Sequence, residues 1–161
     1  MLNIEGLALQ VKSKNGKDST PVWNHVRNIK QMKLIGEIYL ANGLQLNIFD
    51  LSRPIAAGTV KVEISVQSKI DLKESYFSDS RDYHQVKRIF GDNFSYEYKM
   101  ERSFVAKENQ EAIREELLST FKNNSLHYLS SVNFPQKLAL ATLKDIKNNP
   151  YKYKRKPETE A

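Results

Sequence analysis

The feature that most constrains this fold is a strict alternation of apolar and polar residues over residues 59–67, TVKVEISVQ. Successive side chains of a β-strand point to opposite faces of the sheet, so this segment is predicted to be a strand. The apolar positions are Val60, Val62, Ile64 and Val66, and the polar positions are Lys61, Glu63, Ser65 and Gln67. One apolar and one polar face are typical of an antiparallel sheet that is wet on its outer side.

A β-hairpin is predicted just before this strand, around the turn residues 41–43. A two-residue Asn-Gly loop would set apolar residues opposite polar ones on each face. A three-residue loop instead pairs Leu40 with Leu44 and Ile38 with Leu46, and its last glycine can adopt the positive φ that such loops require. The three-residue loop is therefore the favoured register, because it keeps apolar residues together.

Helical periodicity follows the alternating strand. Residues 81–90 carry apolar side chains at helical spacing, with Asp79 or Ser80 placed to cap the first turn and Gly91 placed to end the helix with a left-handed residue. Further helices are predicted over residues 105–123, 126–132 and 135–147. Pro135 opens the last of them, because proline is tolerated in a first helical turn.

Residues 94–104 return to a period of two, with Phe94, Tyr96, Tyr98 and Met100 on one face. Because the opposite face is strongly polar, we expect the aromatic row to be buried in the core. The alternative is a base-stacking platform in which Tyr96 and Tyr98 lie beside Lys99 and Arg102.

The remaining segments give weaker signals. Residues 2–12 alternate with a change of phase at Gly6, which predicts a strand with a glycine bulge. Residues 12–20 are a polar loop, and residues 21–31 fit a short helix and a strand about equally well. Residues 52–54 are interpreted as a polar turn.

This order of elements predicts an α+β fold, because strands and helices are segregated along the chain. We expect a curled antiparallel sheet of about five strands, with one helix before the last strand and a C-terminal helical hairpin. An OB-like barrel is the alternative architecture, and the pattern does not fix the strand order. Residues 1–150 are expected to form one domain and residues 151–161 a basic, flexible tail.

The chain contains no cysteine, which excludes disulfide bonds, thiolate zinc sites and cysteine nucleophiles. The first residues, MLNIEGLALQVKSK, lack a basic segment followed by a long apolar one. No window approaches the apolar length of a membrane span. We therefore expect a cytoplasmic protein without a transmembrane segment.

The positive charge is concentrated at one end of the sequence. The formal net charge is +6, and residues 119–157 contain eight lysines and arginines against the single acidic residue Asp145. Residues 151–156, YKYKRK, alternate tyrosines with cations, a mixture that suits a nucleic-acid backbone. The residues predicted to bind DNA or RNA are Lys144, Lys147, Lys152, Tyr153, Lys154, Arg155 and Lys156.

The alternative is a protein-interaction or assembly module. Cations after a helix C-terminus stabilise the negative end of its dipole, and basic tails are common on proteins that bind no nucleic acid. A partner would then contact a sheet edge or the terminal helices.

Catalysis is not supported by any motif. The histidines His25, His84 and His127 have no metal-binding spacing, and His84 fits a solvated helix face. Asp50 and Glu63 are placed loosely like the carboxylates of a restriction-type nuclease, but Glu63 is not followed by the lysine of that pattern. Nucleotide-binding glycine loops and hydrolase elbows are missing. We predict a non-catalytic protein without a cofactor.

Overall fold

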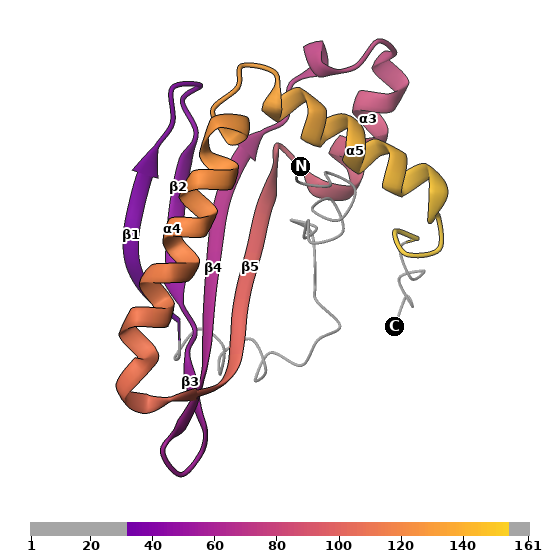
Figure 1. Cartoon of the computed structure of the whole chain (residues 1–161). Coiled ribbons are helices and arrows are strands. Elements are labelled where there is room, and N and C mark those ends of the chain that lie inside the picture. The colour runs from indigo at the N-terminus through magenta and orange to yellow at the C-terminus, as the bar shows by residue number, and fades with distance from the viewer. Residues whose placement is uncertain (1–31, 155–161) are drawn as a thin grey trace.

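A computed structural model describes residues 32–154 of the 161-residue chain. The α+β class is confirmed, with an antiparallel sheet and helices packed against it (Figure 1). The strands are β1 (Lys33–Tyr39), β2 (Gln45–Asp50), β3 (Arg53–Ala56), β4 (Thr59–Asp71) and β5 (Asn93–Ala106). The helices are α3 (Ser80–Phe90), α4 (Gln110–Leu129) and α5 (Phe134–Asn148), with 3-10 turns η1 (Glu74–Tyr76) and η2 (Lys107–Asn109). The predictions for residues 2–12, 12–20 and 21–31 lie outside the described residues.

The predicted hairpin between β1 and β2 is confirmed. Ile38 lies opposite Leu46, and the backbone N–H of Leu40 donates to the carbonyl oxygen of Leu44 at 2.8 Å. Gly43 adopts a φ of +89°, which closes the three-residue loop. The hairpin forms in this register because it brings Leu46, which is 0% exposed, onto the buried face.

The central strand of the sheet is β4, and its apolar positions are buried as predicted. Val62, Ile64 and Val66 are each 0% exposed. β5 pairs with β4 along one edge, whereas β2 and β3 pair with successive parts of the other edge. β2 and β3 thus form one interrupted strand. The interpretation of residues 52–54 as a turn only was wrong, because a short edge strand tolerates Pro54.

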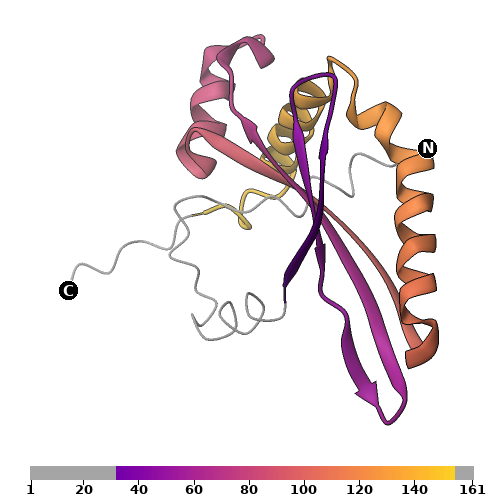
Figure 2. The ribbon, with the colours of Figure 1, turned by 90° about the vertical axis from the view of Figure 1, so that its left-hand side faces the viewer.

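The expectation of a curled sheet was wrong, and the sheet stays open (Figure 2). The β4–β5 ladder runs from the Thr59–Ala106 pair to the Asp71–Asn93 pair. Its register shifts at one place only, between Val60 and Val62. Because bulges supply the sharp bends of a sheet, a ladder with so few of them does not roll into a barrel.

α3 forms before the last strand, as predicted. The side chain of Asp79 caps it by accepting a hydrogen bond from the Arg81 backbone N–H at 2.9 Å. Gly91 follows its last turn with a φ of +80°. Val86 and Phe90 are both 0% exposed and fix the inner face of the helix.

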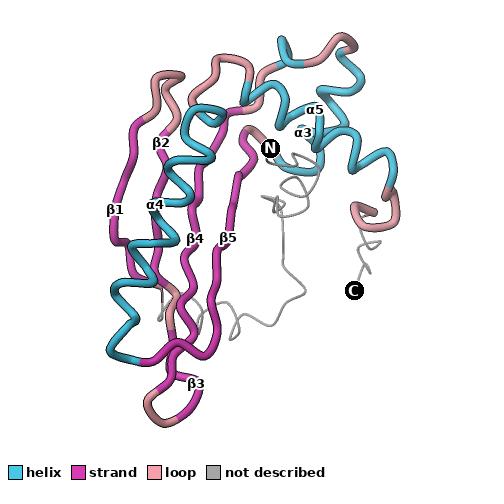
Figure 3. Tube along the Cα trace, in the orientation of Figure 1, coloured by secondary structure: helices cyan, strands magenta, loops and turns pink. Residues whose placement is uncertain are grey.

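The two C-terminal helices are confirmed, but they do not form a hairpin over the sheet. α4 packs on β4 and β5, whereas α5 packs on α3 and η1 (Figures 1 and 3). α4 is also continuous where two helices were predicted. The polar residues 122–124 lie on its exposed side, while Phe121, Ser125 and Leu129 keep a spacing of four residues on its buried side.

Candidate functional site

α5 separates its residues sharply between a buried and an exposed face. Its apolar side chains face the core, including Leu138 and Ala139, which are both 0% exposed. Its exposed positions carry Lys137, Lys144 and Lys147, together with Leu140 and Asn148. At 1.5 Å of rise per residue, the three lysines span about 15 Å of the helix axis. We call Lys137, Lys144 and Lys147 the lysine face.

Asp145, the acidic residue of α5, points away from the lysine face. It is 9% exposed and accepts three side-chain hydrogen bonds. The donors are Asn149 Nδ2 at 2.8 Å, Lys152 Nζ at 3.0 Å and the hydroxyl of Tyr153. This cluster, the Asp145 latch, folds the segment after α5 back against the helix.

The latch also packs Tyr153 against the core. The Tyr153 ring meets the ring of Phe90 edge-on, with centroids 5.9 Å apart. Burial and the hydrogen bond to Asp145 raise the pKa of the Tyr153 hydroxyl. Burial by itself would raise the pKa of Asp145, but the hydrogen bonds from Tyr153, Lys152 and Asn149 outweigh it and lower that pKa.

The structure brings together only part of the predicted site. Lys144 and Lys147 belong to the lysine face, whereas Lys152 and Tyr153 belong to the latch. Lys154 lies over the exposed ring of Tyr151, 4.4 Å from its centroid. The other two predicted residues, Arg155 and Lys156, lie outside the described residues.

An ion pair joins the lysine face to α3. Lys147 Nζ lies 3.0 Å from Oδ1 of Asp82, in the first turn of α3. Beside it, Asp79 holds the Arg81 guanidinium, with Arg81 Nη2 at 2.8 Å from Asp79 Oδ2. The side chain and backbone N–H of Arg81 lower the pKa of Asp79, and Lys147 contributes to the same effect. The lysine face therefore joins the start of α3 through an ion pair, and Asp79 and Asp82 offset part of the positive charge there.

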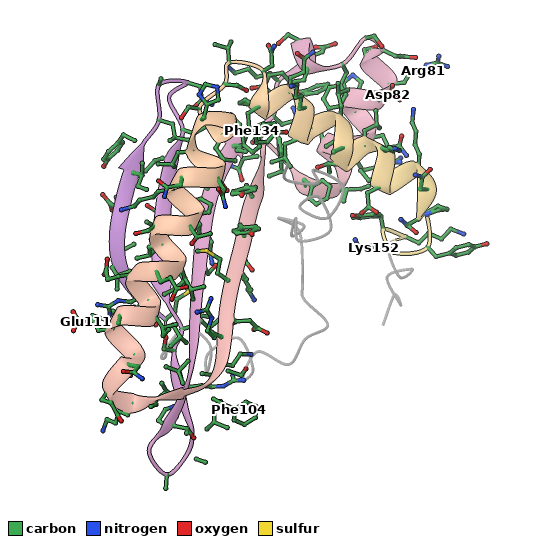
Figure 4. The ribbon with its side chains drawn as sticks, viewed as in Figure 1. Arg81, Asp82, Phe104, Glu111, Phe134 and Lys152 are labelled. Carbon is green, nitrogen blue, oxygen red and sulfur yellow. The ribbon has the colours of Figure 1, made fainter. Side chains whose placement is uncertain are left out.

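The exposed side of α3 holds a shallow hollow of about 430 Å³, wide open to solvent, that the sequence reasoning missed. Among the described residues it is lined by Arg81, His84, Gln85 and Arg88. Their spacing of three, four and seven residues places them on one side of the helix. Figure 4 shows Arg81 pointing outward at the start of α3. The sequence signal for this hollow is the spacing of the two arginines around His84, which fits a solvated helix face equally well.

The other candidate residues have structural partners. Asp50 Oδ1 accepts from the Ser52 backbone N–H at 2.8 Å, and Asp50 Oδ2 lies 3.4 Å from Arg114 Nη1. Glu63 lies 3.9 Å from Lys61 Nζ. Tyr96 is 0% exposed, so the aromatic row is part of the core and the base-stacking alternative is wrong for it.

Comparisons with protein-family models, with curated proteins and with solved structures give no match for this chain. Within residues 32–154, no helix combines the length and the apolar character needed to cross a membrane. The same part of the chain holds no group of three histidine, cysteine or acidic side chains arranged to bind a metal ion.

Proposed function

We propose that this protein binds the phosphate backbone of DNA or RNA without sequence preference and without catalysis. The lysine face of α5 makes the main contact, and the cations that follow the helix extend it. One observation carries the proposal: the exposed face of α5 presents three lysines and no carboxylate. That arrangement depends on Asp145, which turns inward and is held by the latch.

The physical basis is the release of counterions condensed on a nucleic acid. Each phosphate neutralised on duplex DNA contributes about −0.9 to the slope of log affinity against log salt. Three lysines therefore predict a slope between about −2 and −3. The lower magnitude allows for lysines that share their charge with a neighbour, as Lys147 does with Asp82.

The test is fluorescence anisotropy with labelled duplex DNA, single-stranded DNA and single-stranded RNA of arbitrary sequence, at several salt concentrations. The triple variant K137Q/K144Q/K147Q should bind more weakly and show a shallower salt slope. A variant ending at Lys154 should weaken binding in proportion to the loss of Arg155 and Lys156 while keeping the latch intact.

The matched control is K99Q/K107Q/K122Q, which removes the same charge from β5, η2 and α4. Its affinity should stay close to that of the unaltered protein. Equal losses of affinity in the two triple variants would mean that binding depends on the net charge of the protein and not on the lysine face. Absence of binding by the unaltered protein near physiological salt would overturn the proposal outright.

A second candidate function, protein interaction, has one observation in its favour at the opposite end of the sheet. Ser103 and Phe104 lie opposite the single residue Lys61, which forms a bulge. Phe104 is 77% exposed and has a φ of +57°, a conformation that side-chain-bearing residues rarely adopt. Ile55 of β3, which pairs with the same end of β4, is 42% exposed. Binding of a protein through this apolar end would persist at high salt, which separates it from phosphate contact.

A further inference from the structure

The hollow on α3 is lined by groups that donate hydrogen bonds to anions. Arg81 and Arg88 lie about 10.5 Å apart along the helix axis, and His84 and Gln85 lie between them. Among the described residues, no carboxylate lines the hollow. Two guanidinium groups, an imidazole and an amide are the side chains that recognise phosphate oxygens.

The guanidinium of Arg81 is oriented by a neighbouring carboxylate. Asp79 Oδ2 accepts from Arg81 Nε at 3.1 Å and from Arg81 Nη2 at 2.8 Å. This pair fixes the plane of the guanidinium and leaves Nη1 outside the contact with Asp79. The Nε and Nη2 donors are therefore occupied by Asp79, and the fixed guanidinium can present Nη1 to a phosphate group with little further loss of conformational entropy.

We infer that the α3 hollow is a phosphate-binding subsite that continues the lysine face of α5. The two surfaces meet where Lys147 of α5 lies 3.0 Å from Asp82 of α3, next to Arg81. One nucleic-acid strand that crosses this junction places successive phosphates on both helices. This inference rests on the proposed function, because it assigns the backbone phosphates as the ligand.

The first experiment measures nucleic-acid binding by the double variant R81Q/R88Q. Because exposed ionic contacts are weak individually, loss of two of them should weaken binding about tenfold. The control is R53Q/R102Q, which removes two arginines from the β3 and β5 end of the sheet and should have little effect. Circular dichroism spectra identical to that of the unaltered protein establish that both variants are folded.

The second experiment titrates the protein with inorganic tripolyphosphate and follows the ring resonances of His84 by NMR. In the unaltered protein these resonances should shift to saturation, and in R81Q/R88Q they should not. The shift should persist in K137Q/K144Q/K147Q, because that variant leaves the hollow intact.

The two experiments distinguish failure of the phosphate subsite from failure of the proposed function. If R81Q/R88Q binds nucleic acid as well as R53Q/R102Q does and tripolyphosphate shifts nothing, the hollow is no phosphate site, whatever the lysine face does. If tripolyphosphate binds in the hollow but no nucleic acid binds, the proposed function fails, and the ligand is a free phosphorylated compound instead of a strand.

Discussion

The Asp145 latch yields the sharpest prediction for stability. Tyr153→Phe keeps the ring that packs edge-on against Phe90 and removes only the hydroxyl that donates to Asp145. A hydrogen bond to a charged acceptor contributes about 1.5–3 kcal/mol to stability. Since Lys152 and Asn149 still donate to the same carboxylate, we expect the low end of that range, about 1.5 kcal/mol.

Two further variants measure the contributions of the Lys152 ion pair and of the Asp145 carboxylate to the latch. Lys152→Gln should cost less than about 1 kcal/mol, because the Lys152 side chain is 41% exposed and water screens its ion pair. Asp145→Asn should cost more, about 2–3 kcal/mol, because it weakens all three contacts at a side chain that is 8% exposed. The double variant of Asp145 and Tyr153 should then show a coupling energy of about 1.5 kcal/mol.

Urea denaturation at neutral pH measures these free energies, and its pH dependence provides a second readout. The folded pKa of Asp145 lies below its usual value, so its contribution is present above about pH 4 and is lost as the pH falls through the folded pKa. The folded pKa of Tyr153 is raised, so its contribution is lost as the pH rises above about 10. Additive effects of the two substitutions, or an unchanged acid limb in Asp145→Asn, would refute the latch.

Two other predictions concern backbone geometry and the hairpin. Phe104→Gly should be more stable than Phe104→Ala by about 1 kcal/mol in thermal unfolding, because only glycine adopts a φ of +57° without strain. The same pair of substitutions at Ser103 should rank in the opposite order, and the same order at both positions would show that no strain is present. Asn42→Ala should cost about 2 kcal/mol in urea denaturation, because Asn42 Nδ2 donates to the carbonyl oxygens of Leu129 at 2.7 Å and Ser131 at 2.9 Å. A loss below about 0.5 kcal/mol would mean that these contacts between hairpin and helix are exchanged for water at no cost.

Features of the fold that depend on neighbours in sequence were predictable. The β1–β2 register follows from the pairing of Ile38 with Leu46 and from the positive φ of Gly43, and both are local properties. The strand β3 was not predictable, because residues 53–56 are all exposed and show no apolar alternation. It exists because β4 extends beyond β2 and offers an unpaired edge.

The candidate site was likewise predictable only where it depends on residues close together in the sequence. Lys144 and Lys147 were identified from charge density along the sequence, and helical spacing is enough to place them together. The position of Tyr153 was not predictable, because its ring packs on Phe90 of a distant helix. The hollow on α3 was missed for a related reason. The side of α3 that carries Arg81 and Arg88 can be recognised as a binding surface only when the residues that bury the other side of the helix are known.

The distribution of charge over α4 and α5 has a consequence for how this molecule approaches a polyanion. The turn η2 and the first half of α4 expose Glu108, Glu111, Glu115 and Glu116, and α5 exposes lysines. The start of α4 lies at one end of the molecule and α5 at the other (Figures 1 and 4). Under the proposed function, such an electric moment would exert a torque in the field of a nucleic acid and turn the lysine end of the protein forward before contact. Orientation of this kind raises the encounter rate at low ionic strength, and it fades once the screening length falls to about 8 Å at physiological salt.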